Sequence, residues 1–321
     1  MAVGIKEIAA LAGVSPSTVS NVLNSRKNVS EETRESVLAI CHEQNFEVNL
    51  ASRALRNGEN RTILFNFSDF DRQFYLEIIH GIHDYACAKD FDLIICTSKS
   101  CEKFMNKAFT CGSIIQDIRC SNEMLLRKSA EGYPIVVLDR VLKDSTIKSV
   151  IVNNYNAEKE LVTGLAEKGY RKFAFLSGPE SDDSRERYKA FTDVLNERGI
   201  HFSREQYYLG DYREKSGNQA ARLIMLAETL PEILICANDN MAIGAIRAFR
   251  ENGLRVPEDI AVCGFDDTEM ARVMDVTTVS IPYYERGYLA AQYLIENVNG
   301  SENYEPFMVS AKVKWRSTTQ K

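Results

Sequence analysis

Residues 5–24 read IKEIAALAGVSPSTVSNVLN, and this stretch decides how the amino-terminal part of the chain folds. Apolar side chains at positions 5, 8, 9 and 12 repeat with helical spacing, which predicts a short helix over 5–12. Gly13 ends that helix, Ser15 is suited to cap the next one, and Pro16 fits its first turn, so a second helix is expected over 16–24. Two short helices across a glycine-containing turn form the helix-turn-helix pattern.

A third helix is expected after Ser30, which is placed to cap it, with acidic residues at 31 and 32 near its positive end. Val37, Leu38 and Cys41 form its apolar stripe. Three such helices bind DNA in some proteins and only cover a larger domain in others. Periodicity alone therefore leaves both interpretations open.

Beyond residue 61, strand-like and helix-like segments alternate, which predicts an α/β core of parallel sheets with helices on both faces. Expected strands lie at 62–67, 92–97, 113–117, 135–139, 149–152, 172–177, 232–237 and 259–264. Expected helices lie near 75–89, 122–131, 155–168, 184–198, 214–228, 239–252 and 284–298. The pattern restarts after Asn154, so we expect two doubly wound lobes.

Polar and aromatic side chains follow several of these strands. Ligands of such sheets bind at the carboxyl ends of the strands, and a cleft between two lobes would collect those ends. A single aspartate there more often caps the next helix, but aromatic faces beside carboxylates, amides and guanidinium groups suit a polyhydroxylated ligand. The residues singled out from strand position are Arg72, Phe74, Tyr75, Asp139, Arg140, Asn153, Arg187, Asn238 and Asp266.

Composition limits the remaining function classes. The 321 residues carry a net charge of −6 and no apolar run near the roughly 18 residues that span a bilayer. The first twelve residues lack the apolar core of a secretion signal, so a cytoplasmic protein with no membrane contact is expected. Eight cysteines without a C-x-x-C pair favour reduced thiols over disulfides.

No chemistry-bearing motif points to an enzyme. The phosphate-loop, dinucleotide and nucleophile-elbow patterns are all absent from the sequence. His80 and His83 are three apart on an expected helix, but no third metal ligand is near them in sequence. We therefore expect no catalytic residues, no metal site and no cofactor.

The string at 5–24, with NVSEETR at 28–34, resembles the headpiece of the lac repressor and galactose repressor family. Further matching stretches lie at 137–140, 186–191, 237–245, 253–260, 264–267 and 277–279, so the resemblance spans nearly the whole chain. It implies a headpiece over 1–48, a hinge over 49–60 and a core over 61–321 that is similar to periplasmic sugar-binding proteins. Lobe one would hold about 61–154 and 283–306, and lobe two about 155–282 and 307–321.

The resemblance assigns DNA contacts to the second helix and the hinge. Pro16, Ser17 and Asn21 would read base edges, although many relatives carry arginine at position 21, so adenine suits Asn21 better than guanine. Leu55 would wedge into the minor groove. Because residues 1–61 hold seven basic and seven acidic side chains, phosphate attraction depends on their placement. The remaining residues assigned to DNA are Ser15, Thr18, Ser20, Asn24, Arg53 and Arg56.

The core positions that match the family imply an effector pocket between the lobes. Departures from the family pattern leave the ligand open: Arg72 stands in place of a common asparagine, Asn153 of an aspartate, and Ile235 of an aromatic residue. Arg72 beside Arg140 and Arg187 would suit an anionic sugar acid or sugar phosphate, whereas a neutral sugar fits the remaining groups.

The resemblance therefore predicts a transcriptional regulator, by default a repressor, that binds a pseudo-palindromic operator as a homodimer. A sugar or sugar derivative in the cleft would change operator affinity allosterically. Two other classes stay in view: a transport-type sugar-binding protein with incidental amino-terminal helices, and an enzyme on a doubly wound fold.

Overall fold

The computed structural model describes residues 4–23, 28–44, 46, 60–68, 70, 72–142, 146–299 and 307–320. The chain divides into two compact units, Met1–Asn60 and Arg61–Lys321. Each is described on its own below. In the described part of the chain, no helix has the length and apolarity needed to cross a membrane.

The first unit is a bundle of α1 (Ile5–Leu11), α2 (Pro16–Leu23) and α3 (Glu31–Glu43). Both predicted caps are present, because the Thr18 amide donates to Ser15 Oγ at 3.1 Å and the Thr33 amide donates to Ser30 Oγ at 3.3 Å. The predicted stripe of α3 is partly wrong: Leu38 is 47% exposed. The small core is formed by Ile8, Ala9, Val19, Val22, Val37 and Cys41.

The first lobe of the second unit is built on a six-stranded parallel sheet with strand order β11-β5-β4-β3-β1-β2. Its strands are β1 (Thr62–Phe67), β2 (Asp92–Thr97), β3 (Gly112–Gln116), β4 (Ile135–Val137), β5 (Ile147–Val152) and β11 (Phe307–Val309). Its helices are α5 (Phe74–Ala88), α6 (Cys101–Phe104), α7 (Asn122–Ala130) and α13 (Tyr283–Val298), with the turn η1 (Ser98–Ser100) before α6.

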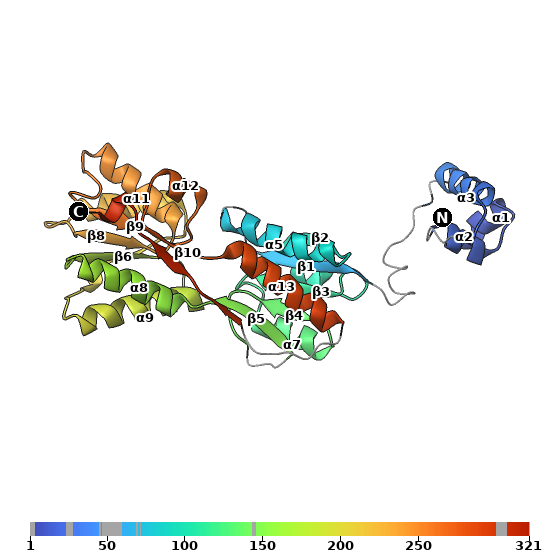
Figure 1. Cartoon of the computed structure of the whole chain (residues 1–321), viewed down its shortest axis with the longest axis horizontal. Coiled ribbons are helices and arrows are strands. Elements are labelled where there is room, and N and C mark those ends of the chain that lie inside the picture. The colour runs from blue at the N-terminus through green and yellow to red at the C-terminus, as the bar shows by residue number, and fades with distance from the viewer. Residues whose placement is uncertain are drawn as a thin grey trace. The chain divides into compact units, whose positions relative to one another are not determined.

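Helices α5 and α13 lie side by side although about 200 residues separate them in the sequence (Figure 1). Two glycines permit this close packing. A methyl group added at Gly81 would lie 2.0 Å from the Tyr284 carbonyl oxygen, and one at Gly287 would lie 2.1 Å from that of Ile78. This packing fixes the start of both helices, which border the cleft between the lobes.

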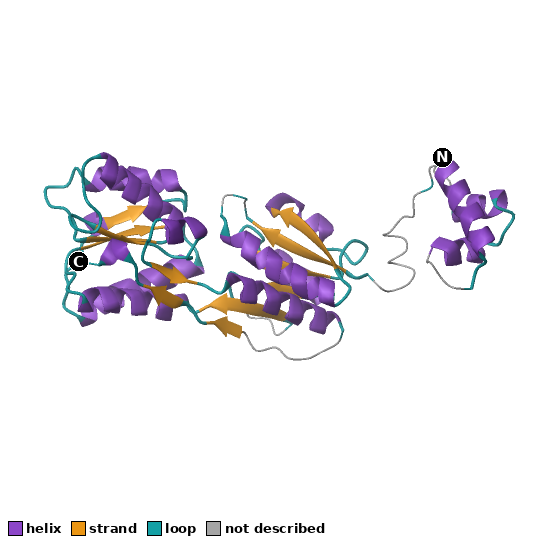
Figure 2. Ribbon diagram, turned by 45° about the horizontal axis from the view of Figure 1, so that its top comes forward, coloured by secondary structure: helices purple, strands orange, loops and turns teal. Residues whose placement is uncertain are grey.

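The second lobe has a four-stranded parallel sheet with strand order β7-β6-β8-β9. Its strands are β6 (Phe173–Ser177), β7 (Tyr207–Leu209), β8 (Ile233–Cys236) and β9 (Ala261–Cys263). Its helices are α8 (Asn154–Glu167), α9 (Asp182–Glu197), α10 (Glu214–Ile224), α11 (Asp239–Glu251) and α12 (Glu269–Val273), with the turns η2 (Arg204–Gln206) and η3 (Ser317–Thr319). Figure 2 shows helices on both faces of the sheets, as the alternating pattern predicts.

Three chain segments connect the two lobes. They run from β5 to α8, from β10 (Thr278–Ser280) to α13, and from β11 to β12 (Lys312–Lys314), and β10 pairs with β12 in an antiparallel ribbon. The predicted lobe boundary needs one correction. Residues 307–309 were expected in the second lobe, but they form β11, which pairs with β5 in the first sheet.

The predicted architecture is confirmed: an all-α amino-terminal unit is followed by two parallel-sheet lobes. Every predicted strand beyond residue 61 coincides with an observed one. The elements that sequence periodicity missed are short, with three to five residues each: β7, β10, β11, β12, α6 and α12.

Candidate functional sites

The amino-terminal end of α2 presents hydroxyl groups at the surface of the first unit. Ser15 and Ser17 are exposed, and Ser15 Oγ lies 2.7 Å from Ser17 Oγ and 2.8 Å from Thr18 Oγ1. Pro16 is exposed as well, and Ser20 and Asn21 are partly exposed, while the opposite side of α2 is buried in the core. Asn24, Arg53, Leu55 and Arg56, which were also assigned to DNA, lie outside the described residues.

A cavity of about 350 Å³ opens between the two lobes of the second unit, with a smaller hollow of about 50 Å³ beneath it. The sequence-predicted residues that line one or both are Arg72, Phe74, Tyr75, Asp139, Arg187, Asn238 and Asp266. Strands β1, β3, β4, β6, β8 and β9 thus bring their carboxyl ends together as the sheet topology predicts.

Asp139, which follows β4, is the principal carboxylate of the first-lobe wall. It is only 8% exposed, and neither of its oxygens accepts a hydrogen bond from the described residues. Burial raises its pKa to about 6, although the charge of Arg140 opposes this rise. A buried acceptor without a donor is costly, so Asp139 is a group that a bound ligand would satisfy.

Arg140 lines neither of the cavities that Arg72 and Arg187 line. Its guanidinium group donates to the carbonyl oxygens of Asp117 and Cys120, at 3.4 Å and 2.5 Å, and lies 3.6 Å from Asp139 Oδ2. It borders a separate hollow of about 240 Å³ on the other side of Asp139. The expected cluster of Arg72, Arg140 and Arg187 is therefore wrong as regards Arg140.

Arg72 of the first lobe reaches the second lobe across the cavity. Its guanidinium carbon lies 4.4 Å from the centre of the Tyr212 ring. Gly178 makes room for that ring, because an added methyl group would lie 2.0 Å from it. A cation over an aromatic face is attracted to it, so this contact holds the lobes together.

Arg187 on α9 anchors the second-lobe wall. It donates to Asn154 Oδ1 at 2.9 Å and to the Ala237 carbonyl oxygen at 2.8 Å, and it lies 3.5 Å from the centre of the Phe265 ring. Asn238 is equally engaged. Its oxygen accepts the amide of Met241 at 3.0 Å, which caps α11, and its nitrogen donates to the Tyr212 carbonyl oxygen at 2.9 Å.

Asp266 lies between the lobes at the end of the chain segment that follows β9. Its backbone has a φ of +116°, a conformation that non-glycine residues rarely adopt. The Tyr283 hydroxyl donates to Asp266 Oδ1 at 2.5 Å, and burial raises the pKa of Asp266 to about 6. The Tyr283 ring stacks on Phe74 at 4.6 Å, which gives the cleft an aromatic surface.

Besides Arg140, two further predicted residues do not line the 350 Å³ cavity or the 50 Å³ hollow. Asn153 caps α8, because its side chain accepts the Asn156 amide at 3.0 Å. Ile235 is 1% exposed and belongs to the apolar core, since the side chains of a central strand point into the layers on either side of the sheet.

Sequence reasoning missed Asp183, Tyr212 and Tyr283. Asp183 accepts a hydrogen bond from Asn154 Nδ2 at 2.8 Å and lines both cavities. A helical spacing of four residues from Arg187 was the available signal, because it puts both side chains on one face of α9. Nothing in the sequence marks Tyr212.

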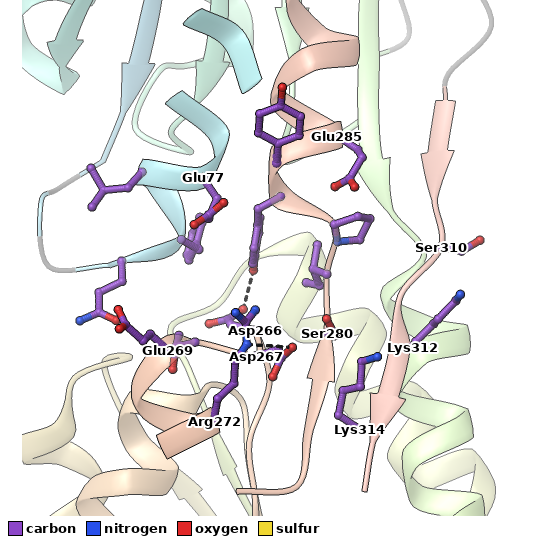
Figure 3. A pocket seen from close by; sticks show the side chains of 18 residues that line it. Glu77, Asp266, Asp267, Glu269, Arg272, Ser280, Glu285, Ser310, Lys312 and Lys314 are labelled. Carbon is purple, nitrogen blue, oxygen red and sulfur yellow. Dashed lines mark hydrogen bonds and ion pairs between the residues drawn. The ribbon is translucent and has the colours of Figure 1, made fainter. Parts of the chain in front are cut away.

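A larger hollow of about 860 Å³ lies at the connecting segments and shares Asp266 and Phe74 with the cleft. Figure 3 shows Lys312 and Lys314 of β12 on one side, with Glu269 and Arg272 of α12 across from them. Arg272 is 3.3 Å from Asp267, which also pairs with Arg316 at 2.6 Å. These ion pairs tie α12 and the carboxyl-terminal segment to the same turn.

Comparison with known proteins matches both units. Residues 4–49 match the family model of bacterial regulatory proteins of the lacI family, and residues 162–319 match a periplasmic binding protein-like domain. The HTH-type transcriptional regulator RegA of Clostridium saccharobutylicum is 31% identical over 318 residues, which covers 95% of this chain and 96% of the relative.

Two solved structures cover almost the whole chain. The lac repressor dimer bound to operator and the anti-inducer ONPF is 25% identical, with a TM-score of 0.79 and 99% of each chain covered. The complex of the transcriptional regulator CelR with cellobiose is 25% identical, with a TM-score of 0.73, and covers 98% of this chain and 99% of that one. The chain belongs to the LacI family of bacterial regulatory proteins, which are transcriptional regulators and not enzymes.

Proposed function

We propose that this protein is a repressor that binds a pseudo-palindromic operator as a homodimer. A sugar-type effector in the inter-lobe cleft changes its affinity for that operator. The observation that carries the proposal is the pairing of an exposed hydroxyl row on α2 with a cleft whose buried Asp139 has no hydrogen-bond donor among the described residues.

The chemistry of α2 supports DNA reading. A helix in the major groove presents its amino-terminal side chains to base edges. Ser17 and Asn21 offer groups that donate and accept there, while Pro16 offers apolar contact to a thymine methyl group. The similar lac repressor structure is itself a dimer bound to operator.

The cleft supports a polyhydroxylated effector. Asp139 requires donors, which sugar hydroxyls supply, and the Phe74 and Tyr283 rings offer faces to sugar C–H groups. Five aspartates and five arginines line the two cavities, so their charges balance, and it is the unsatisfied acceptors of Asp139 that favour a neutral sugar, whose hydroxyls donate, over an anionic one. The similar CelR structure holds cellobiose.

Exposed apolar residues support a dimer. Large apolar side chains on the surface of a monomer often mark an interface. Five of the exposed large apolar side chains lie on or directly beside α5, α10 and α12: Leu76, Leu223, Leu226, Met270 and Val273. The three segments that join the lobes would allow effector closure to change the spacing of the paired headpieces.

The operator is found by selection from random duplexes, followed by titration with fluorescence anisotropy. We expect Ser17→Ala with Asn21→Ala to weaken specific binding by about 1–3 kcal/mol for each side chain that reads a base edge. Ser36→Ala, which removes an exposed hydroxyl of α3, is the matched control and should bind like the wild type. Failure to enrich any sequence at modest ionic strength, with or without sugars, would contradict the proposal.

The effector is sought by thermal unfolding, because a ligand that binds only the native state raises its stability. The full chain is heated with cellobiose, other neutral sugars, sugar acids and sugar phosphates. We expect a rise with a neutral sugar that Asp139→Ala abolishes. A rise with sugar phosphates alone would instead assign the site to anions held by Arg72.

A further inference from the structure

Three cysteine thiols converge in the first lobe, at the edge of the sheet beside the cleft. Cys96 lies near the end of β2, Cys101 begins α6, and Cys120 lies in the loop between β3 and α7. Cys101 lies with Cys96 and Cys120 in one buried cluster of this lobe, and hydrogen bonding from the two neighbouring thiols raises the pKa of Cys101. Three cysteines that are up to 24 positions apart in the sequence therefore lie close together in the fold.

Asn66 of β1 holds the two outer thiols. Cys96 Sγ donates to Asn66 Oδ1 at 3.3 Å, and Asn66 Nδ2 donates to Cys120 Sγ at 3.2 Å. Cys101 Sγ also donates to the thioether of Met105 at 3.5 Å. Asn66 is itself fully buried, so the fold specifies an amide whose two ends each face a thiol.

The remaining cysteines near this lobe are arranged differently. Cys87 is exposed on α5 and contacts His83, and Cys111 interacts with the Thr62 carbonyl oxygen. Neither is placed beside a second thiol by any contact in the described residues. Within the cluster, Cys96 is the most exposed at 9%, against 3% for Cys120 and 1% for Cys101, so a small oxidant meets it first.

We propose that this cluster is a thiol oxidation site, at which peroxide converts Cys101 and one neighbouring thiol, first Cys96, into a reversible disulfide. Cys96 loses its proton, its thiolate attacks one peroxide oxygen, and the O–O bond breaks. The departing hydroxide takes up that proton to form water, and Cys96 remains as a sulfenic acid. Cys101 gives up its proton and attacks the Cys96 sulfur, and the S–O bond breaks with release of water. Two thiols thereby reduce one hydrogen peroxide to two waters.

The hydrogen bonding of the cluster favours this order. The hydrogen bond from Cys101 lowers the pKa of Cys96, which makes Cys96 the better thiolate nucleophile. Cys101 is the resolving thiol because it shares one buried cluster with both others. Cys120 is then placed to exchange with the new bond.

The cluster is connected to the cleft, and this consequence rests on the proposed function. The segment between Cys96 and Cys101 includes Ser98, whose hydroxyl donates to Asp117 Oδ2 at 2.5 Å, and Asp117 lines the 350 Å³ cavity. Arg140 holds the Cys120 carbonyl oxygen. A disulfide that clamps this segment would change the first-lobe wall and, with it, effector affinity.

Peptide mapping tests the oxidation site without any effector or DNA. The reduced full chain is treated with hydrogen peroxide, quenched with catalase, alkylated with N-ethylmaleimide and digested with trypsin. Cleavage after Lys99, Lys103 and Arg119 places the three cysteines in separate peptides, 90–99, 100–103 and 120–127. We expect peptide 100–103 to be cross-linked to 90–99, or after exchange to 120–127, and dithiothreitol to release it.

Two variants sharpen the result. Cys101→Ser should abolish both cross-links, whereas Cys87→Ser, which removes the exposed thiol, should leave them unchanged. The wild-type map decides the proposal even if a variant does not fold. A fully alkylated Cys101 after peroxide treatment, a cross-link that omits Cys101, or irreversible oxidation of Cys96 alone would overturn it, whatever operator or effector the protein has.

Discussion

The two walls of the inter-lobe cleft differ in how far the protein itself satisfies their polar groups. On the second-lobe wall, Arg187 and Asn238 each form two hydrogen bonds within the chain. On the first-lobe wall, Asp139 accepts none from the described residues, and Arg72 stacks on a ring of the opposite lobe. The second-lobe residues are fixed in advance, whereas Asp139 on the first-lobe wall is left for a ligand to satisfy.

The two sets of residues therefore contribute differently to the stability of the ligand-free protein. A pre-formed wall contributes to folding and binds with little reorganisation, because its side chains are already fixed. An unsatisfied buried carboxylate reduces stability until a donor arrives, which is the usual exchange of stability for function. Replacement of Arg187 and replacement of Asp139 should therefore change stability in opposite directions.

Removal of Arg187 should have the largest effect. In Arg187→Ala, Asn154 is left without its donor, and the carboxylates Asp183 and Asp266 are left without a buried cation that lies near them. Breaking a buried charge network of this kind costs about 3–5 kcal/mol. Chemical denaturation should show a large fall in the free energy of unfolding, and effector binding should be abolished.

The control for this change lies on the same helix. Arg185 is exposed and pairs with Glu180 and Asp182 at the surface. Exposed pairs contribute little, so Arg185→Ala should change stability by less than about 1 kcal/mol. Equal falls in stability in the two variants would show that the second-lobe wall is not specially built.

Replacement of Asp139 should have the opposite sign. Its folded pKa of about 6 lies above the ordinary aspartate value of 3.8, so at pH 8 the charged form opposes folding, and Asp139→Asn should stabilise the protein by up to about 3 kcal/mol. Between pH 6 and 4 the native state binds more protons than the unfolded state. The free energy of unfolding of the wild type therefore rises relative to that of Asp139→Asn as pH falls, and the difference between the two proteins shrinks. Denaturation at pH 8 and pH 5 measures this convergence.

A partnered aspartate on the same wall is the matched control. Asp117 accepts hydrogen bonds from Ser98 and from the backbone and side chain of Arg119. Asp117→Asn should therefore destabilise the protein at pH 8, by about 1–2 kcal/mol. If both substitutions destabilise it to the same extent, the contrast between partnered and unpartnered groups is wrong.

Sequence patterns predicted the long elements because periodicity accumulates over many residues. Each strand expected beyond residue 61 and each long helix was found close to its predicted bounds. Segments such as β10 and β12 were missed, since three residues carry no period and their pairing joins positions more than 30 residues apart. The predicted burial of Leu38 was wrong for a geometric reason. Leu38 is adjacent to the buried Val37, and each step along a helix turns the side chain by about 100°.

The site was predicted only as far as strand ends identify it. Asp139, Arg187, Asn238 and Asp266 line the cleft because parallel strands all end at one edge. That rule does not predict the direction of a side chain. Arg140 therefore donates to backbone carbonyl oxygens, and Ile235 packs in the core, although both were expected at the ligand. Tyr212 lies in a loop and has a φ of +67° itself, and no local sequence motif predicts that conformation.

The smallest of the three effects should come from the contact between Arg72 and Tyr212, which is one of those that join the two walls. Arg72→Ala removes the cation over Tyr212, which is worth about 0.5–1 kcal/mol at a half-exposed site, and should raise the population of open lobes. Small-angle X-ray scattering of the ligand-free protein should then show a larger radius of gyration, while Arg72→Lys keeps a cation near the ring and should show a smaller change. If Arg72→Ala leaves the radius unchanged, the connecting segments and other contacts such as that of Tyr283 with Asp266 hold the lobes without it, and Asp139 depends on the ligand for its polar contacts whereas the wall does not depend on Arg72 for its position.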